Sequence, residues 1–363
     1  MVKNLLMSVI LIFYILSCSS QNEKNIQRKN IDFSATNKIV LASDSLFPDQ
    51  LTAFYGILAN DSSGFSLVAP NLKLLLKYDF EGKLTQVAAG KALKDDFKIP
   101  SGYFPSHFCQ KGDTLFLLYP DKHIYATVNN EVVKKITLQI PPNTVLTRGT
   151  PFFYDSVRNI FVLSFGKDYE KSKDFFSKSQ PLSLFDAQTG KLIKSFGEYP
   201  EAYKQGSSFL GGLNYIRSLR ESSCFYVMYP HFSQVYQYDF EGNLLNTFYL
   251  PESEERDTTF RFSKQLLDNL SRAELDKIRN DAYIGGFAKE KDENIFYYSF
   301  QANKLSKIYI CKYDADKQLF TQTALPKISS FIHLFPHVFD GKLYFFSHNS
   351  LIDDLYIYET VLD

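Results

Sequence analysis

The chain has 363 residues, with 40 Lys and Arg against 40 Asp and Glu, so its formal net charge is zero. This balance argues against nucleic acid as a partner, because binding to a phosphate backbone needs an excess of basic side chains. The 34 Phe and 24 Tyr residues, with no Trp, suit half-buried β-strands and argue against a helical bundle.

The N-terminus predicts an exported protein. Lys3 is followed by an apolar run over residues 5–16 and by the small residue Ser17, which is the pattern of a secretory signal peptide. The apolar run is shorter than the roughly 20 residues that span a bilayer. The chain is therefore expected to be translocated rather than to remain as a membrane-spanning helix.

Cys18 is the expected lipid attachment site. The segment Ile15-Leu16-Ser17-Cys18 resembles the bacterial lipobox, whose cysteine is lipidated and becomes the first mature residue. The alternative is an ordinary signal peptide with Cys18 near its cut site, but the polar run 19–25 has the composition of a tether. We therefore expect a signal peptide at 1–17, a tether at 18–36 and a folded domain at 37–363. The location would be the cell envelope, at the outer membrane, facing either the periplasm or the outside.

A polar turn between two apolar strands recurs along the folded part. Asp and Gly at the turn fit a hairpin, because Gly adopts positive φ without a steric penalty. The copies span residues 78–84, 185–192, 238–244 and 313–319.

An aromatic-rich strand lies upstream of each turn, and a shorter apolar strand precedes it, as at 152–154 and 337–339. Each unit then has an inner, a second, a third and an outer antiparallel strand. A repeat of roughly 50 residues with four strands is typical of a β-propeller blade, so the chain is predicted to be an all-β, six-bladed propeller. The six aromatic-rich strands span 65–70, 115–120, 160–166, 225–230, 295–300 and 343–348.

The two ends of the folded part complement each other. The last copy stops at its third strand, 356–361, while a spare strand at 38–43 precedes the first copy. Pairing of these two would close the ring and remove its exposed edges. The alternating residues of 235–238 and 308–313 predict strands with one buried face. A pair of β-sandwiches and an irregular β-solenoid are the alternative folds.

Two insertions interrupt the repeats. One, at 167–181, separates the second and third strands of the third blade. The other, at 252–280, lies between the fourth and fifth blades and is predicted to be helical, with a cap at Ser263 and a capping box from Ser271 to Glu274. In a propeller both insertions emerge on the face where the central channel usually binds ligands.

The sequence carries no motif for catalysis, for a cofactor or for a metal. His333 and His337 have the spacing of a metal-binding helix, but Pro336 between them precludes that helix. Cys109, Cys224 and Cys311 are widely spaced and lie in apolar stretches, so we expect buried free thiols. We therefore predict no catalytic residue, no cofactor and no metal site.

A set of polar and aromatic residues is expected at the rim of the channel. They either precede the inner strands or lie in loops between second and third strands, and could bind a glycan or a carboxylate. The alternative is that they satisfy backbone groups and loop ends. These residues are His107, Arg148, Asn214, Tyr215, Tyr283 and His337 before the inner strands, with His231 and Asn349 in the loops.

Taken together, the lipobox, the Tyr-Pro strand endings and the Tyr-Asp-x-x-Gly-x-Leu turns resemble the uncharacterised six-bladed propeller lipoproteins of Bacteroidetes, a domain-of-unknown-function family. The resemblance covers the chain from Lys38 to Asp363. The chain also loosely resembles the NHL-repeat class. These motifs are architectural, so the resemblance implies a fold and no active-site residue.

Three roles follow from this sequence. The first is a binding or scaffold module, anchored in the membrane through Cys18, for a peptide, a protein or a glycan. The second is a hydrolase or lyase acting on an extracellular saccharide or lactone at the channel, which would need a cluster of acid and base groups there. The third is a structural member of an envelope complex, which would expose a large apolar patch.

Overall fold

The computed structural model consists of β-strands, numbered β1 to β26, in the part of the chain that it describes. Within that part, no helix has the length and the apolar character needed to cross a bilayer. The predicted helical insertion at 252–280 lies outside the described residues, apart from 252–256 and Ser271. The described residues are 27–30, 37–40, 56–61, 64–69, 74–79, 81–88, 107–129, 131–140, 144–146, 152–167, 179–201, 204, 216–256, 271, 284–302, 307–326, 333–339, 342–348 and 356–361.

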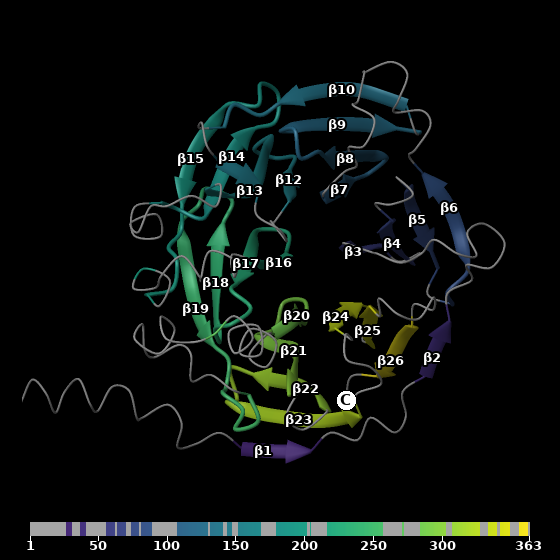
Figure 1. Ribbon diagram of the computed structural model, residues 1–363, viewed down its shortest axis with the longest axis vertical. Helices are drawn as coiled ribbons and strands as arrows, with labels where there is room; N and C mark the ends of the chain where they lie inside the picture. The colour runs from purple at the N-terminus through teal and green to yellow at the C-terminus, as the bar shows by residue number, and fades with distance from the viewer. Residues whose placement is uncertain are drawn as a thin grey trace, which may run out of the picture.

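The described strands form six sheets, numbered here in chain order, and Figure 1 shows them arranged around a common centre. The strands of each repeated unit follow chain order from the centre outward and pair antiparallel, whereas β1 (Gln27–Asn30) and β2 (Asn37–Val40) are added at the outer edges of sheets 5 and 6. This arrangement of four-stranded units is the propeller-like architecture that the repeats predict.

Sheets 1 to 3 come from the first half of the chain. Sheet 3 differs from the other two because β11 and β12 both pair with β13, so that its inner position is divided between two short strands. In the sequence, the predicted rim residue Arg148 comes between β11 and β12, outside the described residues. Sheet 1 has β3 (Gly56–Asp61), β4 (Gly64–Ala69), β5 (Leu74–Tyr78) and β6 (Leu84–Ala88); sheet 2 has β7 (His107–Lys111), β8 (Thr114–Leu118), β9 (His123–Val128) and β10 (Glu131–Thr137); sheet 3 has β11 (Thr144–Leu146), β12 (Phe153–Asp155), β13 (Ile160–Lys167), β14 (Leu182–Asp186) and β15 (Leu192–Phe196).

Sheets 4 to 6 complete the arrangement, and the last two take a strand from the N-terminal part of the chain. Sheet 4 has β16 (Arg217–Arg220), β17 (Cys224–Met228), β18 (Gln234–Asp239) and β19 (Leu244–Tyr249); sheet 5 has β20 (Ile284–Lys289), β21 (Ile295–Ala302), β22 (Lys307–Asp314), β23 (Leu319–Pro326) and β1 (Gln27–Asn30); sheet 6 has β24 (His333–Phe339), β25 (Lys342–His348), β26 (Tyr356–Val361) and β2 (Asn37–Val40).

The strand β2 pairs antiparallel with β26, with Ile39 opposite Ile357. It therefore takes the outer position of sheet 6, which is the partner that the sequence predicts for the spare strand at 38–43. The first and last strands of the folded domain thus belong to the same sheet.

The strand β1 falls within 18–36, the range predicted to be a tether. It pairs with β23 in the parallel direction, with Gln27 opposite Leu319 and Asn30 opposite Gln322. Figure 1 shows β1 alongside β23 at the outer edge of sheet 5. The edge of this sheet is consequently covered by a segment of the same chain.

The hydrophobic core lies between neighbouring sheets. On β17, Cys224, Tyr226 and Met228 pack against sheet 5, whereas Phe225 and Val227 pack against sheet 3. All five residues of this strand are buried. The strand β17 therefore has two apolar faces, and each face is covered by a different sheet.

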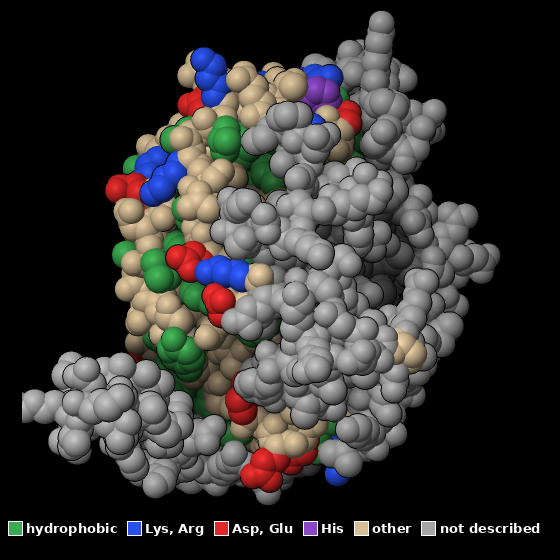
Figure 2. Space-filling model, turned by 60° about the vertical axis from the view of Figure 1, so that its left-hand side comes forward, with side chains coloured by type: hydrophobic (Ala, Val, Ile, Leu, Met, Phe, Trp, Pro, Cys, Tyr) green, Lys and Arg blue, Asp and Glu red, His purple; other side chains and the backbone are tan. Residues whose placement is uncertain are grey.

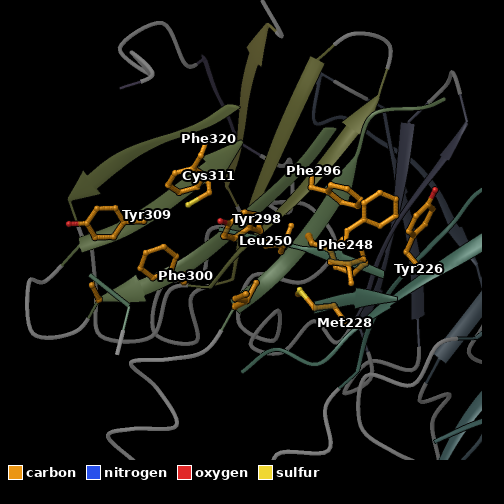
Figure 3. Close-up of a cluster of buried hydrophobic side chains, with 14 of the residues drawn as sticks. Tyr226, Met228, Phe248, Leu250, Phe296, Tyr298, Phe300, Tyr309, Cys311 and Phe320 are labelled. Carbon is orange, nitrogen blue, oxygen red and sulfur yellow. The ribbon is translucent and has the colours of Figure 1, made fainter. Parts of the chain in front are cut away.

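The cluster between sheets 4 and 5 is rich in aromatic side chains (Figure 3). Phe248 and Phe296 lie with their ring centroids 4.9 Å apart, and the rings of Phe300 and Tyr309 stack at 5.1 Å. Burial of each such side chain contributes about 1.5–3 kcal/mol to folding. Aromatic residues are abundant in this chain because these contacts hold the sheets together.

The prediction of one buried face was wrong for residues 308–313. Residues 308–311 of β22 are consecutively buried. The reason is that sheet 5 has a neighbour on both sides, so a strand within it loses the alternation of a sheet with one face in water. By contrast, Tyr236 and Gln237 of β18 retain partial exposure.

The repeated Asp organises the turn between the third and outer strands. Asp79 Oδ1 accepts hydrogen bonds from the backbone N–H groups of Glu81 and Lys83 at 3.0 and 2.8 Å. Asp239 Oδ1 accepts the same two bonds from Glu241 and Asn243, at 2.9 and 2.8 Å. The carboxylate thus satisfies donors that the tight turn leaves without backbone partners.

The repeated Gly adopts positive φ and allows close contact with the preceding sheet. Gly190 has φ of +73°, and its carbonyl accepts a hydrogen bond from Gln139 N at 2.8 Å. A Cβ atom on Gly190 would lie 2.1 Å from Thr137 O, at the end of sheet 2. The turn motif therefore serves contact between sheets as well as chain reversal.

Each sheet has two ends, which we call the turn face and the loop face. The turn face carries the first-to-second and third-to-outer turns, and ion pairs such as Arg158 with Glu241 join it from sheet to sheet. The loop face carries the second-to-third loops and the links between sheets. Both predicted insertions leave the strands at the loop face, after Lys167 of β13 and beyond Tyr249 of β19.

Substitution of Gly190 by Ala tests the role of the turn in sheet contact. Gly190→Ala combines strain at positive φ with a clash against backbone, and should lower the free energy of unfolding by about 3 kcal/mol. Gly112, with φ of +55° and no atom within 4 Å of the added Cβ, is the matched control. Gly112→Ala should cost only about 1 kcal/mol of strain. Equal losses in urea unfolding would show that contact with Thr137 adds nothing.

Candidate binding site at the loop face

His107 is the predicted rim residue that the structure places most directly at the loop face. It is the first residue of β7, the innermost strand of sheet 2. Its Nδ1 atom is buried and has no hydrogen-bond partner in the part of the chain that the structure describes. Burial lowers the pKa of His107 to about 4, so the imidazole is neutral at pH 7. A neutral imidazole nitrogen can accept or donate one hydrogen bond, depending on its tautomer.

His231 also lies at the loop face, in the loop between β17 and β18, as predicted. It is fully buried, with 0% of its surface exposed. The same loop is held by Arg256, whose guanidinium donates hydrogen bonds to Pro230 O at 3.3 Å and to Ser233 Oγ at 3.0 Å. His231 is thus part of a fixed wall rather than of an exposed rim.

The loop around Arg256 joins sheets 4 and 5. Arg256 is 5% exposed and lies 3.6 Å from the carboxylate of Glu252. Tyr298 of β21 donates a hydrogen bond to Pro251 O at 2.9 Å, and Ser253 donates one to Gln322 of β23 at 3.1 Å. These contacts fix the start of the segment that carries the second predicted insertion.

The position predicted for His337 requires correction. The inner strand β24 begins at His333, so that His337 lies within the strand, opposite Tyr344 and near the turn face. The predicted start, close to Pro336, was wrong because an innermost strand tolerates Pro at its free edge. Burial lowers the pKa of His337 to about 4 as well. His333 takes the position at the loop face that was expected for His337.

Five of the predicted site residues lie outside the described residues. In the sequence, Tyr283 directly precedes β20 and Tyr215 comes two positions before β16. Their roles at the rim stay predictions. The five are Arg148, Asn214, Tyr215, Tyr283 and Asn349. The predicted lipidation site, Cys18, is also outside the described residues.

A second cluster of polar side chains lies between sheets 4 and 5 at the turn face. Lys289, the last residue of β20, has a side chain 2% exposed and forms an ion pair with Glu221 Oε1 at 2.7 Å. Tyr226 donates a hydrogen bond to the other oxygen of Glu221 at 3.1 Å, and Gln237 donates one to the Tyr226 hydroxyl at 3.1 Å. The cluster thus contains an acid, a base and a phenol in contact.

The turn-face cluster is built as a structural network. The Lys289 ammonium also donates to Glu290 O at 3.0 Å and lies 5.3 Å from the centre of the Tyr226 ring. Burial, with a side-chain hydrogen bond to Cys224, raises the pKa of Tyr226 far above its ordinary value, so the phenol stays protonated. All of these groups are satisfied by one another, which suits the joining of two sheets better than proton transfer to a substrate.

The three cysteines are free thiols and are buried, as predicted. Burial raises the pKa of Cys109 and of Cys311 well above the ordinary value of a thiol. A protonated, buried thiol is a poor nucleophile. Within the described residues, no group of three or more His, Cys, Asp or Glu side chains could hold a metal ion.

Lys289, Glu221 and Arg256 were not among the site residues predicted from the sequence. Arg256 belongs to the charged run 252–256, which has the composition of a solvated loop. Lys289 and Glu221 are separated by 68 positions, and only the neighbouring placement of two sheets brings them together. No local pattern in the sequence could have indicated these contacts.

Figure 2 shows the side of the molecule formed by the outer strands of sheets 3 and 4. Acidic and basic side chains are interspersed there, with apolar side chains between them. The exposed apolar residues on these strands are Ile193, Leu244, Leu245 and Tyr249. Neither positive nor negative charge therefore dominates among the described residues on this side of the molecule.

Comparisons with known proteins identify the fold. No family model matches the sequence, and no curated protein matches it. The structure is similar to a member of the DUF4221 family from Bacteroides vulgatus, with a TM-score of 0.59 and 11% identity over 90% of this chain and 97% of that one. It is equally similar to a Bacteroides fragilis protein named as exported, with a TM-score of 0.58 and 11% identity over 93% and 99% of the two chains. Identity this low shows a shared fold.

A virginiamycin B lyase from Staphylococcus aureus aligns less well. Its TM-score is 0.47 at 10% identity, over 90% of this chain and 99% of the lyase. A likeness at this level carries no argument about activity.

Loss of the buried ammonium tests the turn-face cluster. Lys289→Met leaves the Glu221 carboxylate, whose side chain is 21% exposed, without its cation. We expect the free energy of unfolding in urea to fall by about 3 kcal/mol. Lys317→Met, which removes an ammonium 74% exposed and paired with Asp314, is the control and should change stability far less. Similar losses in both variants would contradict a special role for the buried pair.

The pKa values of His107 and His337, both lowered to about 4 by burial, predict a pH dependence of stability. Folding holds His107 and His337 neutral, whereas the unfolded chain takes up protons below pH 6.5, so stability should fall from pH 6.5 to pH 4. Each histidine should account for roughly 2–3 kcal/mol of this loss. A hydrogen bond from the Thr189 hydroxyl lowers the pKa of Asp186 below 3.8. Protonation of Asp186 therefore changes the stability only at more acid pH.

His107→Gln should therefore reduce the slope of the unfolding free energy against pH. The reduction should be about half of the combined contribution of His107 and His337. Urea unfolding at several pH values between 4 and 7 measures this slope. An unchanged slope in His107→Gln would mean that His107 is protonated in the folded protein.

Proposed function

We propose that this chain is an exported lipoprotein, anchored at Cys18, whose six sheets are the blades of a closed propeller and whose loop face binds a peptide, a protein or a glycan. The observation that carries the proposal is the buried Nδ1 of His107, which lacks a partner among the described residues. A buried polar atom without a partner costs about 1–3 kcal/mol unless a ligand or water satisfies it. Such an atom at the inner end of a strand is suited to a ligand in the channel mouth.

The scaffold supports this role. The walls of the loop face are fixed by buried contacts, such as the guanidinium of Arg256 on Pro230 O and Ser233 Oγ. A rigid scaffold with variable loops is the usual design of a binding surface. The predicted insertions at 167–181 and 252–280 would enlarge this surface, and the rim residues outside the described part would contribute side chains to it.

The location in the cell envelope rests on two supports. The first is the N-terminal pattern that ends at Cys18, and the second is the shared fold with a Bacteroides fragilis protein named as exported. In this proposal residues 1–17 are removed, 18–26 connect the lipid to β1 at the edge of sheet 5, and 37–363 form the propeller.

The alternative function is a hydrolase or lyase for an extracellular saccharide or lactone. The observation in its favour is that Glu221, Lys289 and Tyr226 place acid and base groups near the inner strands. Their mutual pairing at the turn face makes this the weaker candidate. A role in an envelope complex is favoured by the exposed apolar residues Leu244, Leu245 and Tyr249 on β19.

A thermal-shift screen of the chain from Ser19 onward tests the binding proposal. The panel consists of glycans, peptides, small carboxylates and divalent metals, because a ligand that binds only the folded state raises the melting temperature. We expect a glycan or a peptide to raise it, and His107→Ala to abolish the shift. His123→Ala is the matched control, since His123 is a half-buried histidine on β9, hydrogen-bonded to Thr137.

The outcomes of this screen separate the roles. A shift that persists unchanged in His107→Ala places the ligand elsewhere and rejects the proposed site. A hit that the protein consumes, with turnover lost in Glu221→Gln, favours the hydrolase or lyase. A panel with no hit rejects glycans, peptides and small carboxylates as the ligand, and directs the search to whole envelope proteins.

A further inference from the structure

The pairing of β1 with β23 determines where the N-terminal tether leaves the fold. Leu319, the first residue of β23, directly follows the turn after Asp314 and therefore lies at the turn face. Gln27 is opposite Leu319, and β1 runs parallel to β23. The chain that precedes Gln27 consequently meets the fold at the turn face of sheet 5, next to β23 (Figure 1).

The length of the remaining tether is short compared with the depth of the sheet. From Cys18 to Gln27 the chain can span at most about 30 Å when fully extended. The strand β23, with 8 residues, is about 26 Å long. A lipid on Cys18 could therefore reach the level of the loop face only if nearly all of the tether ran straight along the outside of sheet 5.

Without the pairing of β1, the tether would be too long to orient the fold on a membrane. If the first fixed residue were Asn37 of β2, the tether would span up to about 65 Å and would permit any orientation of the disc. Pairing of Gln27–Asn30 with β23 thus shortens the tether by about half. The strand β1 therefore limits how the fold can be oriented relative to the membrane, independently of its contribution to stability.

We infer that the turn face at sheet 5 is the surface that lies against the lipid bilayer, and that the loop face points away from the membrane. This inference rests on the proposed lipid anchor at Cys18. The exposed charges of sheet 5 at its turn face are mixed, with Lys291, Glu293, Asp316 and Lys317 among them. The anchor and its short tether hold this surface at the membrane, and attraction to anionic lipid is not required.

The inference gives the loop face an accessible position. A site around His107 would open toward the compartment into which the protein projects, so that a large peptide, protein or glycan could approach it. If the loop face lay on the bilayer instead, only a ligand within the lipid headgroups could enter. The orientation therefore deepens the proposed function by favouring macromolecular ligands in solution.

Two fluorescent labels in sheet 5 test this orientation. Glu293, in the turn after β20, and Lys307, the first residue of β22, are both exposed and lie at opposite ends of the same sheet. Each is replaced by Cys in the lipidated full chain and labelled with a thiol-reactive dye. The buried thiols of Cys109, Cys224 and Cys311 should not react, because burial keeps them protonated and inaccessible.

The labelled proteins are bound to phosphatidylcholine vesicles that contain a headgroup quencher. The Glu293→Cys label should lose most of its fluorescence, and the Lys307→Cys label should keep most of it. Equal quenching of the two labels, or stronger quenching at Lys307→Cys, overturns the orientation. As a control, about 20 Gly and Ser residues inserted after Asn22 lengthen the reach of the tether and should abolish the difference.

Mass measurement of the N-terminal peptide separates failure of the anchor from failure of the orientation. Lipid on Cys18 with equal quenching of both labels rejects the orientation and leaves the anchor intact. An unmodified Cys18, with no binding to vesicles, rejects the anchor and the orientation together. A quenching difference that survives the inserted linker would mean that the disc itself contacts lipid, and that the tether does not set the orientation.

Discussion

The middle strands β13 and β17 each have two apolar faces, and only a neighbouring sheet on each side can remove both from water. This requirement explains most of the structure. On β17 alternate side chains pack toward sheet 3 and sheet 5, and on β13 they pack toward sheet 2 and sheet 4. Sheets with this property cannot stop at a free end without exposing a face. The arrangement around a common centre in Figure 1 gives sheets 3 and 4 a neighbour on both sides.

Polar groups are placed where this packing ends. At the turn face, the Asp of each repeated turn binds backbone N–H groups, and Lys289 with Glu221 bridges two sheets. At the loop face, Arg256 provides a similar bridge through backbone carbonyl and hydroxyl groups. The apolar layers between the sheets are thus bounded at both ends by polar contacts that fix one sheet relative to the next. The buried Nδ1 of His107, like the Nε2 of Gln301, lacks a hydrogen-bond partner among the described residues.

The architecture was predictable because it depends on local sequence patterns that repeat along the chain. The turn at 78–84, the aromatic strand at 225–230 and the spare strand at 38–43 each correspond to an element of the structure. Two features were not predictable for a common physical reason, since they depend on contacts between sheets. Burial of 308–311 on both faces comes from the neighbours of sheet 5, and the Lys289–Glu221 pair joins distant positions. The start of β24 was misplaced because Pro336 is a strand breaker only where its N–H would be needed for pairing.

The pairing of β2 with β26 has a consequence for the order in which the chain can fold. These strands lie near opposite ends of the described chain, so sheet 6 cannot acquire its outer strand until the last of them is available for pairing. Contacts of such long sequence separation form slowly, because a large loop must close first. The other sheets can assemble before it, while β2 remains an unpaired strand. Such a strand is open to pairing with other chains, so a partly folded chain is exposed to aggregation through this edge.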